Sequence, residues 1–236
     1  CLKFADLPGN QTMPDIAPLP TLLVEPIVRA ALLEDLGRAG DITTAAVVPR
    51  EARFSGAMVA RRPGTIAGTA VARIAFELID PALKVSVLQP DGSVVAAGQP
   101  VMHIEGPAQA VVTAERTALN FISHLSGIAT VTAELVTGVG NHKARITCTR
   151  KTTPNLRALE KHAVRAGGGV SHRFGLDDGI LIKDNHVALA GGIRPAIQSA
   201  KAGLGHMVKI EVEVDTLEQL EQALAEGVDA ILLDNM

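Results

Sequence analysis

The sequence predicts an α/β protein with a mixed first half and a second half built from repeated strand and helix units. Hydrophobic residues make up 47% of the 236 residues and aromatic residues only 2%, so alanine, valine, isoleucine and leucine must fill the core, as in parallel α/β layers. Four apolar runs alternate with helical segments in the second half, and this order predicts right-handed β-α-β units and a parallel sheet. The long apolar central strand of a doubly wound fold is missing, so part of an α/β barrel fits better, with an open sheet as the alternative.

The first half combines helical patterns with strand-like runs. Pro26 suits the first turn of a helix that Gly37 can end. The turn Pro90-Asp91-Gly92-Ser93 separates two apolar runs and predicts a hairpin. The predicted helices cover about 26–37, 71–78 and 108–136, the last either continuous or broken near Gly127. The predicted strands cover 85–88, 94–96 and 101–104.

The second half alternates more regularly. Its predicted strands are 144–148, 179–182, 208–214 and 230–233, and its predicted helices are 155–166, 193–202 and 216–225. The abrupt stop after an apolar strand leads us to expect further sequence beyond Met236. At the other end, 1–12 has no periodic pattern and precedes Met13, so we expect a vector-derived or disordered segment there.

Charge and cysteine content restrict the class of protein. A formal net charge of −3 and a pI near 6.2 give no general attraction to nucleic acid or to anionic membranes, so any anion site must be local. No stretch approaches the roughly 18 apolar residues of a membrane span, and no targeting pattern opens the chain, so we expect a cytoplasmic protein. Cys1 and Cys148 form neither a metal cluster nor a disulfide framework, and Cys148 is most simply a buried reduced thiol.

Polar side chains follow each apolar strand of the second half. Thr149-Arg150-Lys151-Thr152 follows the first strand and Lys183-Asp184-Asn185-His186 the second, while Glu211 and Glu213 lie in the third and Asp234 follows the fourth. In an α/β barrel the carboxyl ends of all strands open onto one face. We therefore expect these side chains to converge in a site.

The expected site has a cationic and an anionic half. Between residues 143 and 186 there are nine lysines and arginines against four acids, and the plain alternative is a solvated basic face. Guanidinium groups suit planar carboxylates and phosphates, whereas acids suit Mg²⁺ or ribose hydroxyls. The cationic half is Arg150, Lys151, His172, Arg173 and Lys183, and the anionic half is Glu213 and Asp234. Gly167-Gly168-Gly169 could cradle a phosphate or be a flexible connection.

Several motifs, in order, resemble those of the quinolinate phosphoribosyltransferases, the type II phosphoribosyltransferases of NAD synthesis. The resemblance runs from about Val24 to Asn235. The motifs are Glu34-Asp35-Leu36-Gly37 with Gly40-Asp41-Ile42-Thr43-Thr44, Glu115-Arg116-Thr117-Ala118-Leu119-Asn120, Thr149-Arg150-Lys151-Thr152, His172-Arg173, Lys183-Asp184-Asn185-His186, Glu211-Val212-Glu213-Val214 and Leu232-Leu233-Asp234-Asn235.

The resemblance implies an N-terminal α/β sandwich domain over 13–127, an incomplete α/β barrel with parallel strands over 128–236, and a homodimer with shared active sites. It implies a dicarboxylate pocket and a donor site for 5-phosphoribosyl 1-diphosphate with Mg²⁺ as cofactor, and it implies catalytic roles for three residues. The implied pocket is Arg150, His172, Arg173 and Lys183 with Arg116 from the other subunit, and Thr149 is a further implied substrate-binding residue. The implied catalytic donor-site residues are Lys151, Glu213 and Asp234, the last two also binding the metal. The family's later glycine-rich loops, which hold the 5-phosphate, have no counterpart here.

The implied reaction joins quinolinate to the phosphoribosyl group and releases pyrophosphate and carbon dioxide. Fixed acids near the ribose and a metal on the leaving group would stabilise the charge separation, and no covalent nucleophile is needed. The nearest alternative is a related type II transferase acting on another base, although His172-Arg173 beside Arg150 favours two carboxylates. A lipoyl- or biotinyl-type carrier, suggested by the glycine- and valine-rich stretch 64–106, lacks a modifiable lysine in its turn.

Overall fold

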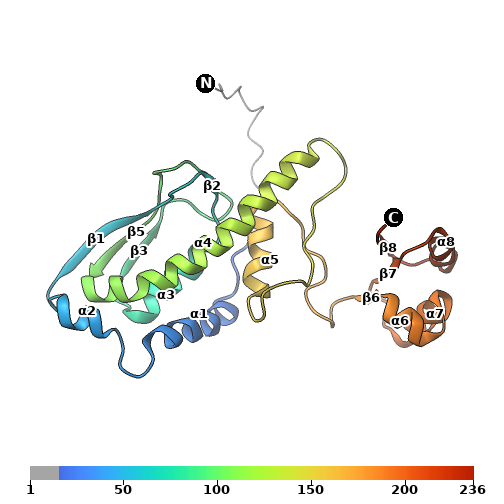
Figure 1. Ribbon diagram of the computed structural model, residues 1–236, viewed down its shortest axis with the longest axis horizontal. Coiled ribbons are helices and arrows are strands. Elements are labelled where there is room, and N and C mark those ends of the chain that lie inside the picture. The colour runs from blue at the N-terminus through green and yellow to red at the C-terminus, as the bar shows by residue number, and fades with distance from the viewer. Residues whose placement is uncertain (1–15) are drawn as a thin grey trace. The chain divides into compact units, whose positions relative to one another are not determined.

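The computed structural model describes residues 16–236 (Figure 1). The expected vector-derived or disordered segment 1–12, with Cys1, and Met13 lie outside the described residues. The chain divides into two compact units, the first ending at Ser171 and the second running from His172 to Met236, and each is described by itself.

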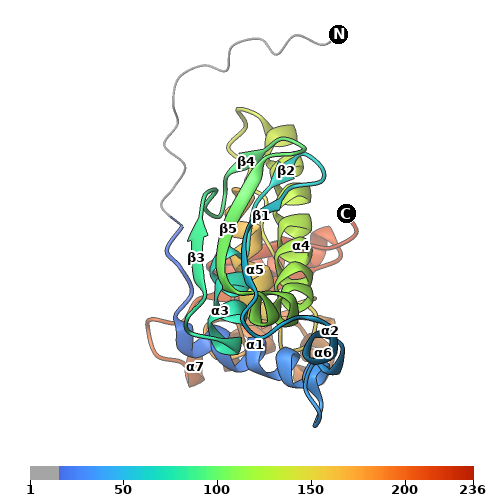
Figure 2. The ribbon, with the colours of Figure 1, turned by 90° about the vertical axis from the view of Figure 1, so that its left-hand side faces the viewer.

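The first unit is a layer of helices on a sheet. Its antiparallel sheet has the strand order β1-β5-β3, and a separate pair is formed by β2 and β4. Helices α3 and α4 cover one face of the larger sheet (Figures 1 and 2), which confirms the expected α/β sandwich. The elements are α1 (Thr21–Leu36), α2 (Ile42–Val47), β1 (Arg53–Val59), β2 (Gly64–Thr65), α3 (Thr69–Ile79), β3 (Lys84–Val87), β4 (Val94–Val95), β5 (Pro100–Pro107), α4 (Ala108–Val139) and α5 (Arg157–Ala166).

The core of this unit is aliphatic, as the composition requires. Among the buried hydrophobic residues described in this unit, Phe76 is the one aromatic side chain, and the rest are alanine, valine, leucine, isoleucine and Met102. Helix α2 begins where Asp41 accepts a hydrogen bond from the Thr44 amide at 2.9 Å, a standard N-cap. The hydrogen bonds from Thr44 lower the pKa of the Asp41 carboxyl.

Helix α4 is 32 residues long and continuous, so the alternative of a break near Gly127 is wrong. Tertiary packing outweighs one glycine, which costs a helix only about 1 kcal/mol. By length and composition alone α4 could cross a membrane, contrary to the expectation that no stretch comes near that limit. Seven of its aliphatic residues belong to the core of the unit, as in the core helix of a folded domain.

Two strand predictions in the first unit are wrong. The runs around Pro90-Asp91-Gly92-Ser93 do not form a hairpin, because β3 pairs with β5 and β4 pairs with β2. The expected strand 144–148 is reduced to one parallel bridge between Thr147 and Val170. The sequence patterns also missed β1, β2 and α2.

The second unit consists of parallel strands connected by helices, as predicted. The strand order is β6-β7-β8, and both pairs are parallel. Buried Ile210, Val212 and Val214 pack with the helices in one core cluster, so helices cover that face of the sheet. Its elements are β6 (Ile180–Ile182), α6 (Asp184–Ala190), α7 (Ile193–Gly203), β7 (Ile210–Val214), α8 (Leu217–Glu226) and β8 (Ala230–Leu233). Helix α6 was not predicted.

Candidate functional site

One face of the parallel sheet carries Lys183, Glu211, Glu213 and Asp234. Strand β7 alternates, so Glu211 and Glu213 point away from the buried side that holds Val212. The register pairs Glu211 with Leu181, and Glu213 with Leu232. Lys183 and Asp234 each lie two residues beyond these partners, and the ladder continues because the Asp234 amide donates to the Val214 carbonyl at 3.0 Å. The expected convergence at the carboxyl ends of these strands is therefore present within the second unit.

The two glutamates on this face have a cationic or an imidazole partner. Lys183 Nζ lies 2.9 Å from Glu213 Oε2, with the Glu213 side chain only 12% exposed. His172 Nε2 lies 2.5 Å from Glu211 Oε2. Asp234 differs, because its Oδ2 accepts a hydrogen bond from the side chain of the next residue, Asn235, at 2.9 Å.

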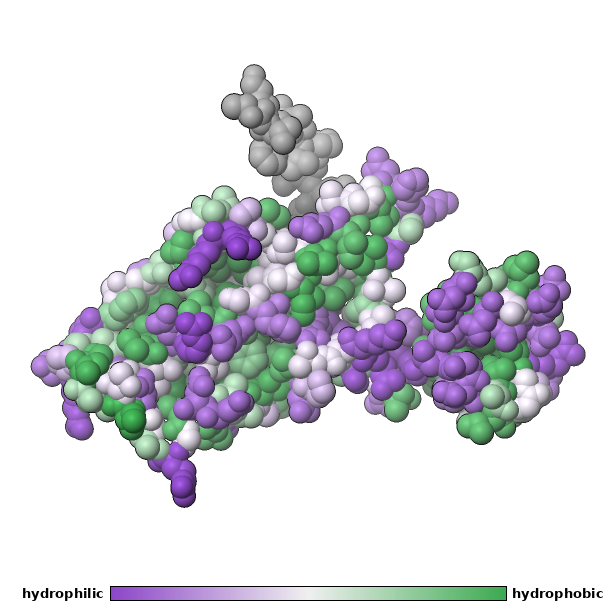
Figure 3. Space-filling view, in the orientation of Figure 1, coloured by the Kyte–Doolittle hydropathy of each residue, from purple (hydrophilic) through white to green (hydrophobic). Residues whose placement is uncertain are grey.

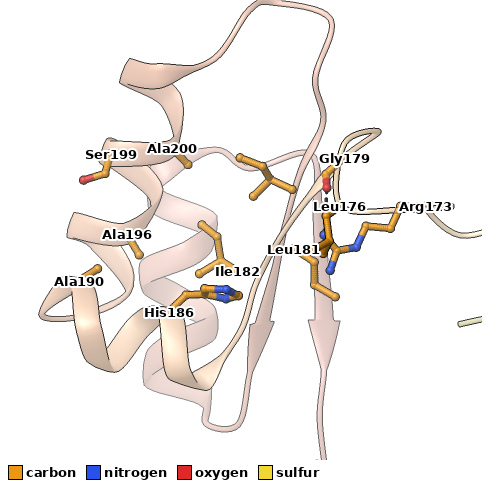
Figure 4. Close-up of a pocket in the computed structure, with 11 residues that line it drawn as sticks. Arg173, Leu176, Gly179, Leu181, Ile182, His186, Ala190, Ala196, Ser199 and Ala200 are labelled. Atoms are coloured by element: carbon orange, nitrogen blue, oxygen red, sulfur yellow. Dashed lines mark hydrogen bonds between the residues drawn. The ribbon is translucent and has the colours of Figure 1, made fainter. Parts of the chain in front are cut away.

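Arg173 lies beside an apolar hollow at the free edge of β6 (Figure 4). Its Nη1 donates to the Gly179 carbonyl at 3.0 Å, while its Nε is buried and has no hydrogen-bond partner among the described residues. The hollow, of about 360 Å³, is lined mainly by aliphatic residues of β6 and α7. His186 also borders it, and its Nδ1 accepts a hydrogen bond from the Lys183 amide at 2.9 Å.

The loop that carries Thr149, Arg150 and Lys151 lies in the first unit and is shaped by local hydrogen bonds. Thr149 Oγ1 accepts from the Lys151 amide at 3.0 Å. Arg157 Nε, at the start of α5, donates to Thr152 Oγ1 at 3.1 Å. Arg150 Nε is buried and, in the part of the chain that the structure describes, has no hydrogen-bond partner.

Helix α5 holds this loop through consecutive buried polar side chains. Glu160 accepts from the Thr153 amide at 3.1 Å and pairs with His124 of α4 at 2.9 Å. Burial alone raises the pKa of the Glu160 carboxyl, but the hydrogen bonds from Thr153 and His124 outweigh it and hold that pKa below its ordinary value. Lys161 Nζ donates to Cys148 Sγ at 2.9 Å, and Cys148 is half-buried rather than fully buried.

Arg116 lies exposed on α4. Across residues 16–236 no hydrogen bond or ion pair involves its side chain. A local ion pair with a neighbouring helical residue, the plain explanation for such an arginine, is therefore not formed.

Exposed apolar residues also occur on helix α4. Figure 3 shows apolar surface over its C-terminal half, where Val131 and Leu135 are 57% and 53% exposed.

The glycine triplet is explained by packing and needs no bound phosphate. A Cβ on Gly167 would lie 2.4 Å from the Ala129 carbonyl oxygen, and one on Gly169 would lie 2.7 Å from Val164 Cγ1. Gly168 has φ +86 and donates its amide to the Arg165 carbonyl at 2.9 Å. The triplet is neither a loose connection nor an evident cradle, because it ends α5 in close contact with α4.

The structure divides the predicted residues between the units. Arg116, Thr149, Arg150 and Lys151 belong to the first, while His172, Arg173, Lys183, Glu213 and Asp234 belong to the second. Within residues 16–236 no group of three or more histidine, cysteine or carboxylate side chains is gathered as a metal site. Glu211 is among the side chains expected to converge but is assigned to neither half of the site, and the alternation along β7 is the signal for its position on the same face as Glu213.

Comparison with known families identifies the chain. The family model for the N-terminal domain of quinolinate phosphoribosyl transferase matches residues 41–126, and the model for the C-terminal domain matches residues 128–236. The chain belongs to the quinolinate phosphoribosyltransferase family. The domain boundary expected after residue 127 stays a prediction, since α4 crosses it without interruption and the compact units divide after Ser171.

Relatives of this family resemble the chain over most of its length. It is 49% identical over 210 residues to nicotinate-nucleotide pyrophosphorylase (carboxylating) from Mycobacterium leprae, covering 88% of this chain and 74% of that protein. The NadC structure from Streptococcus pyogenes matches with 40% identity and a TM-score of 0.89, covering 93% and 78% of the two chains. The nicotinate-nucleotide pyrophosphorylase structure from Francisella tularensis matches with 38% identity and a TM-score of 0.88, covering 94% and 78%.

Proposed function

We propose that this protein is a quinolinate phosphoribosyltransferase that transfers the phosphoribosyl group of 5-phosphoribosyl 1-diphosphate to quinolinate. The products are nicotinate mononucleotide, pyrophosphate and carbon dioxide, a step of NAD biosynthesis. The related protein from Mycobacterium leprae is named for this pyrophosphorylase activity. The observation that best supports the proposal is the face of β7, where Lys183 and Glu213 form a 2.9 Å ion pair beside Asp234 at the carboxyl ends of the parallel strands.

Arginine, lysine and histidine side chains are assigned to quinolinate. Arg150 and Arg173 each have a buried Nε without a described partner, and natural proteins rarely leave such groups unsatisfied. Carboxylates of a bound pyridine dicarboxylate would complete the hydrogen bonding of these guanidinium groups, which recognise planar anions in a bidentate way. Thr149, His172 and Lys183 complete the proposed pocket.

Lys151, Glu213 and Asp234 are assigned to the donor. As pyrophosphate leaves, positive charge develops at C1 of the ribose, and fixed carboxylates nearby stabilise that charge. The pyridine nitrogen then forms the bond to C1. Cleavage of the bond between ring carbon 2 and its carboxylate leaves the electron pair on the ring, where the positive nitrogen stabilises it until solvent supplies a proton.

A magnesium ion fits the donor side of this site. Mg²⁺ is usually bound through one or two carboxylates together with substrate phosphates, and Glu213 and Asp234 provide two carboxylates on one face. When bound, the ion would neutralise charge on the pyrophosphate. Because Glu213 already contacts Lys183, Asp234 is the more available ligand.

Substrate identity is the direct test of the proposed function. The full protein is supplied with Mg²⁺, 5-phosphoribosyl 1-diphosphate and quinolinate that carries a carbon label in its 2-carboxylate. It should form nicotinate mononucleotide and labelled carbon dioxide in equal amounts. Nicotinate in place of quinolinate should give at most a small fraction of this rate. A product formed with nicotinate but not with quinolinate would instead indicate the related transferase that acts on another base.

We further infer that the enzyme acts in the cytoplasm as a homodimer whose sites use Arg116 of the other subunit. Arg116 is exposed without an ion-pair partner in residues 16–236, on a helix that also exposes Val131 and Leu135, and exposed apolar surface is typical of contact sites. The test is complementation between Arg116→Ala and Arg150→Ala in the full protein. Each variant alone should be nearly inactive.

A mixture of the two variants should recover activity if the sites are shared. Random reassortment gives about half heterodimers, each with one intact site of two, so activity should return to about a quarter of that of the wild type. A mixture that stays as inactive as its parents, after subunit exchange has been demonstrated, would rule out the shared site.

A further inference from the structure

We propose that Glu211 is a positioning residue that orients His172 toward quinolinate. This inference rests on the proposed function and adds a residue to it. Glu211 Oε2 lies 2.5 Å from His172 Nε2, and the two side chains are only 21% and 27% exposed. An ionised carboxylate has no hydrogen to donate, so the contact requires the hydrogen on Nε2 and fixes both the plane of the ring and the role of this nitrogen.

Glu211 is a rigid support for this contact. It lies in the middle strand of the parallel sheet, where its backbone is paired with Leu181 on one side and with Ala230 on the other. The residues on either side of it, Ile210 and Val212, are 5% and 0% exposed. A side chain on a strand held in this way positions its partner more accurately than one on a loop.

The His172 imidazole needs this support because it lies outside the strands of the sheet. His172 precedes β6 in a segment without regular structure, and the next residue, Arg173, is tied to the Gly179 carbonyl. The contact with Glu211 therefore adds a rigid anchor to the ring in a segment without regular structure. Without this anchor the imidazole would be less well oriented for quinolinate, and restoring its orientation on binding would weaken the complex.

The second acid of the strand cannot replace Glu211. Glu213 lies on the same face but is paired with Lys183 at 2.9 Å, so each acid has its own partner. An effect that passes through His172 should appear in the binding of quinolinate and not in the binding of the phosphoribosyl donor. A purely structural pair would instead lower stability and disturb both substrates alike.

Steady-state kinetics of the full protein separates these two roles. Glu211→Leu removes the acceptor at similar volume and should raise the KM for quinolinate about tenfold or more, with the KM for 5-phosphoribosyl 1-diphosphate changed less than about twofold. Glu211→Gln keeps an oxygen acceptor and should recover quinolinate KM to within about threefold of wild type. In a His172→Ala background, Glu211→Leu should add less than about twofold, since Glu211 acts through the ring.

Asp229→Asn is the matched control. Asp229 lies at the opposite end of the same strands, where it pairs with Lys209 and accepts from the Ile210 amide at 2.9 Å. Its substitution removes an ion pair from the same sheet and should leave both KM values unchanged.

Three results would overturn the inference. They are an unchanged quinolinate KM in Glu211→Leu, an equal rise of both KM values, and full additivity of Glu211→Leu with His172→Ala. If the wild type makes no nicotinate mononucleotide, the proposed function itself fails and this inference falls with it. If Glu211→Leu does not fold, Glu211→Ala, which also removes the acceptor, and its double variant with His172→Ala decide the question by the same comparison.

Discussion

The buried pair of Asp91 and His162 should be among the most stabilising polar contacts of the first unit. Asp91 Oδ1 accepts from the amide and the hydroxyl of Thr69, and Oδ2 accepts from the Gly68 amide. Oδ2 also lies 2.8 Å from His162 Nε2, and the two side chains are 13% and 7% exposed. The carboxylate therefore caps α3 and connects its first turn to α5.

The substitution Asp91→Asn tests this connection at nearly constant volume. The amide oxygen can replace Oδ1, but the amide nitrogen would then face two donors, the Gly68 amide and His162 Nε2. If the hydrogen of His162 moves to Nδ1, Nε2 can accept from the new amide nitrogen. The hydrogen on Nδ1 is then itself without a partner, because Nδ1 is buried with no hydrogen-bond partner among the described residues. Two buried donors without partners cost about 1 to 3 kcal/mol each, so we expect a loss of about 2 to 6 kcal/mol in the free energy of unfolding.

The assay is denaturant unfolding followed by far-ultraviolet circular dichroism, because the chain has no tryptophan or tyrosine to report by fluorescence. Asp80→Asn is the control, since the Asp80 side chain accepts from the Ala82 amide in an exposed turn. This substitution should cost less than about 1 kcal/mol. A loss for Asp91→Asn no larger than that of the control would refute the reasoning.

The same pair predicts a dependence of stability on pH. Burial by itself raises the pKa of the Asp91 carboxyl, but the hydrogen bonds from His162, Thr69 and Gly68 together outweigh it and lower that pKa. A group with a lowered pKa in the folded state stabilises the fold above its unfolded pKa, about 3.9 for aspartate, and this contribution is lost as pH falls through the folded value. The difference between wild type and Asp91→Asn should stay constant above about pH 5 and shrink below about pH 3.9.

Three further predictions concern packing and the proposed site. Gly167→Ala should lower the midpoint of unfolding by an amount equivalent to about 1 to 3 kcal/mol, because its Cβ would lie 2.4 Å from the Ala129 carbonyl oxygen, whereas Gly138→Ala, which meets nothing within 4 Å, should not lower it. Arg173→Ala should weaken quinolinate binding by about 2 to 4 kcal/mol in calorimetric titration, and unchanged affinity would remove Arg173 from the pocket. Asp234→Asn should preserve quinolinate binding while it lowers turnover and raises the Mg²⁺ concentration needed for half-maximal rate, and lost quinolinate binding with unchanged Mg²⁺ dependence would show that the two halves of the site are wrongly assigned.

The sequence predicted the second unit well because its signals are local. Apolar strand runs and the helices between them have clear periods, and the predicted helix 193–202 corresponds to α7 at Ile193–Gly203. The alternation in β7 also places Glu213 on the open face, since side chains of a strand alternate between faces. Residue patterns of this kind need no knowledge of distant partners.

Pairing over long distances in the first unit could not be predicted in this way. The turn around Asp91 looks like a hairpin turn, but β3 pairs with β5 rather than with β4, and the Asp91 side chain is used instead by the start of α3 and by His162, 71 positions away. The glycines after α5 look like a phosphate loop, yet the reason for Gly167 is the backbone of α4. In both cases the local pattern marked a residue with a special structural role, but it could not show which distant segment that residue contacts.

Helix α5 explains why the loop proposed to bind substrate depends on the core of the first unit. Three consecutive residues of this helix are buried polar groups that contact three different segments: Glu160 holds Thr153, Lys161 contacts Cys148, and His162 contacts Asp91. Successive residues of a helix point about 100° apart, so Glu160, Lys161 and His162 face different directions. Glu160 and Lys161 can therefore hold the loop on both sides of Arg150, at Thr153 and at Cys148. Loss of any one contact removes a hydrogen bond from a buried polar group, and the geometry of the loop 149–153 is thereby coupled to the stability of α3 and α4.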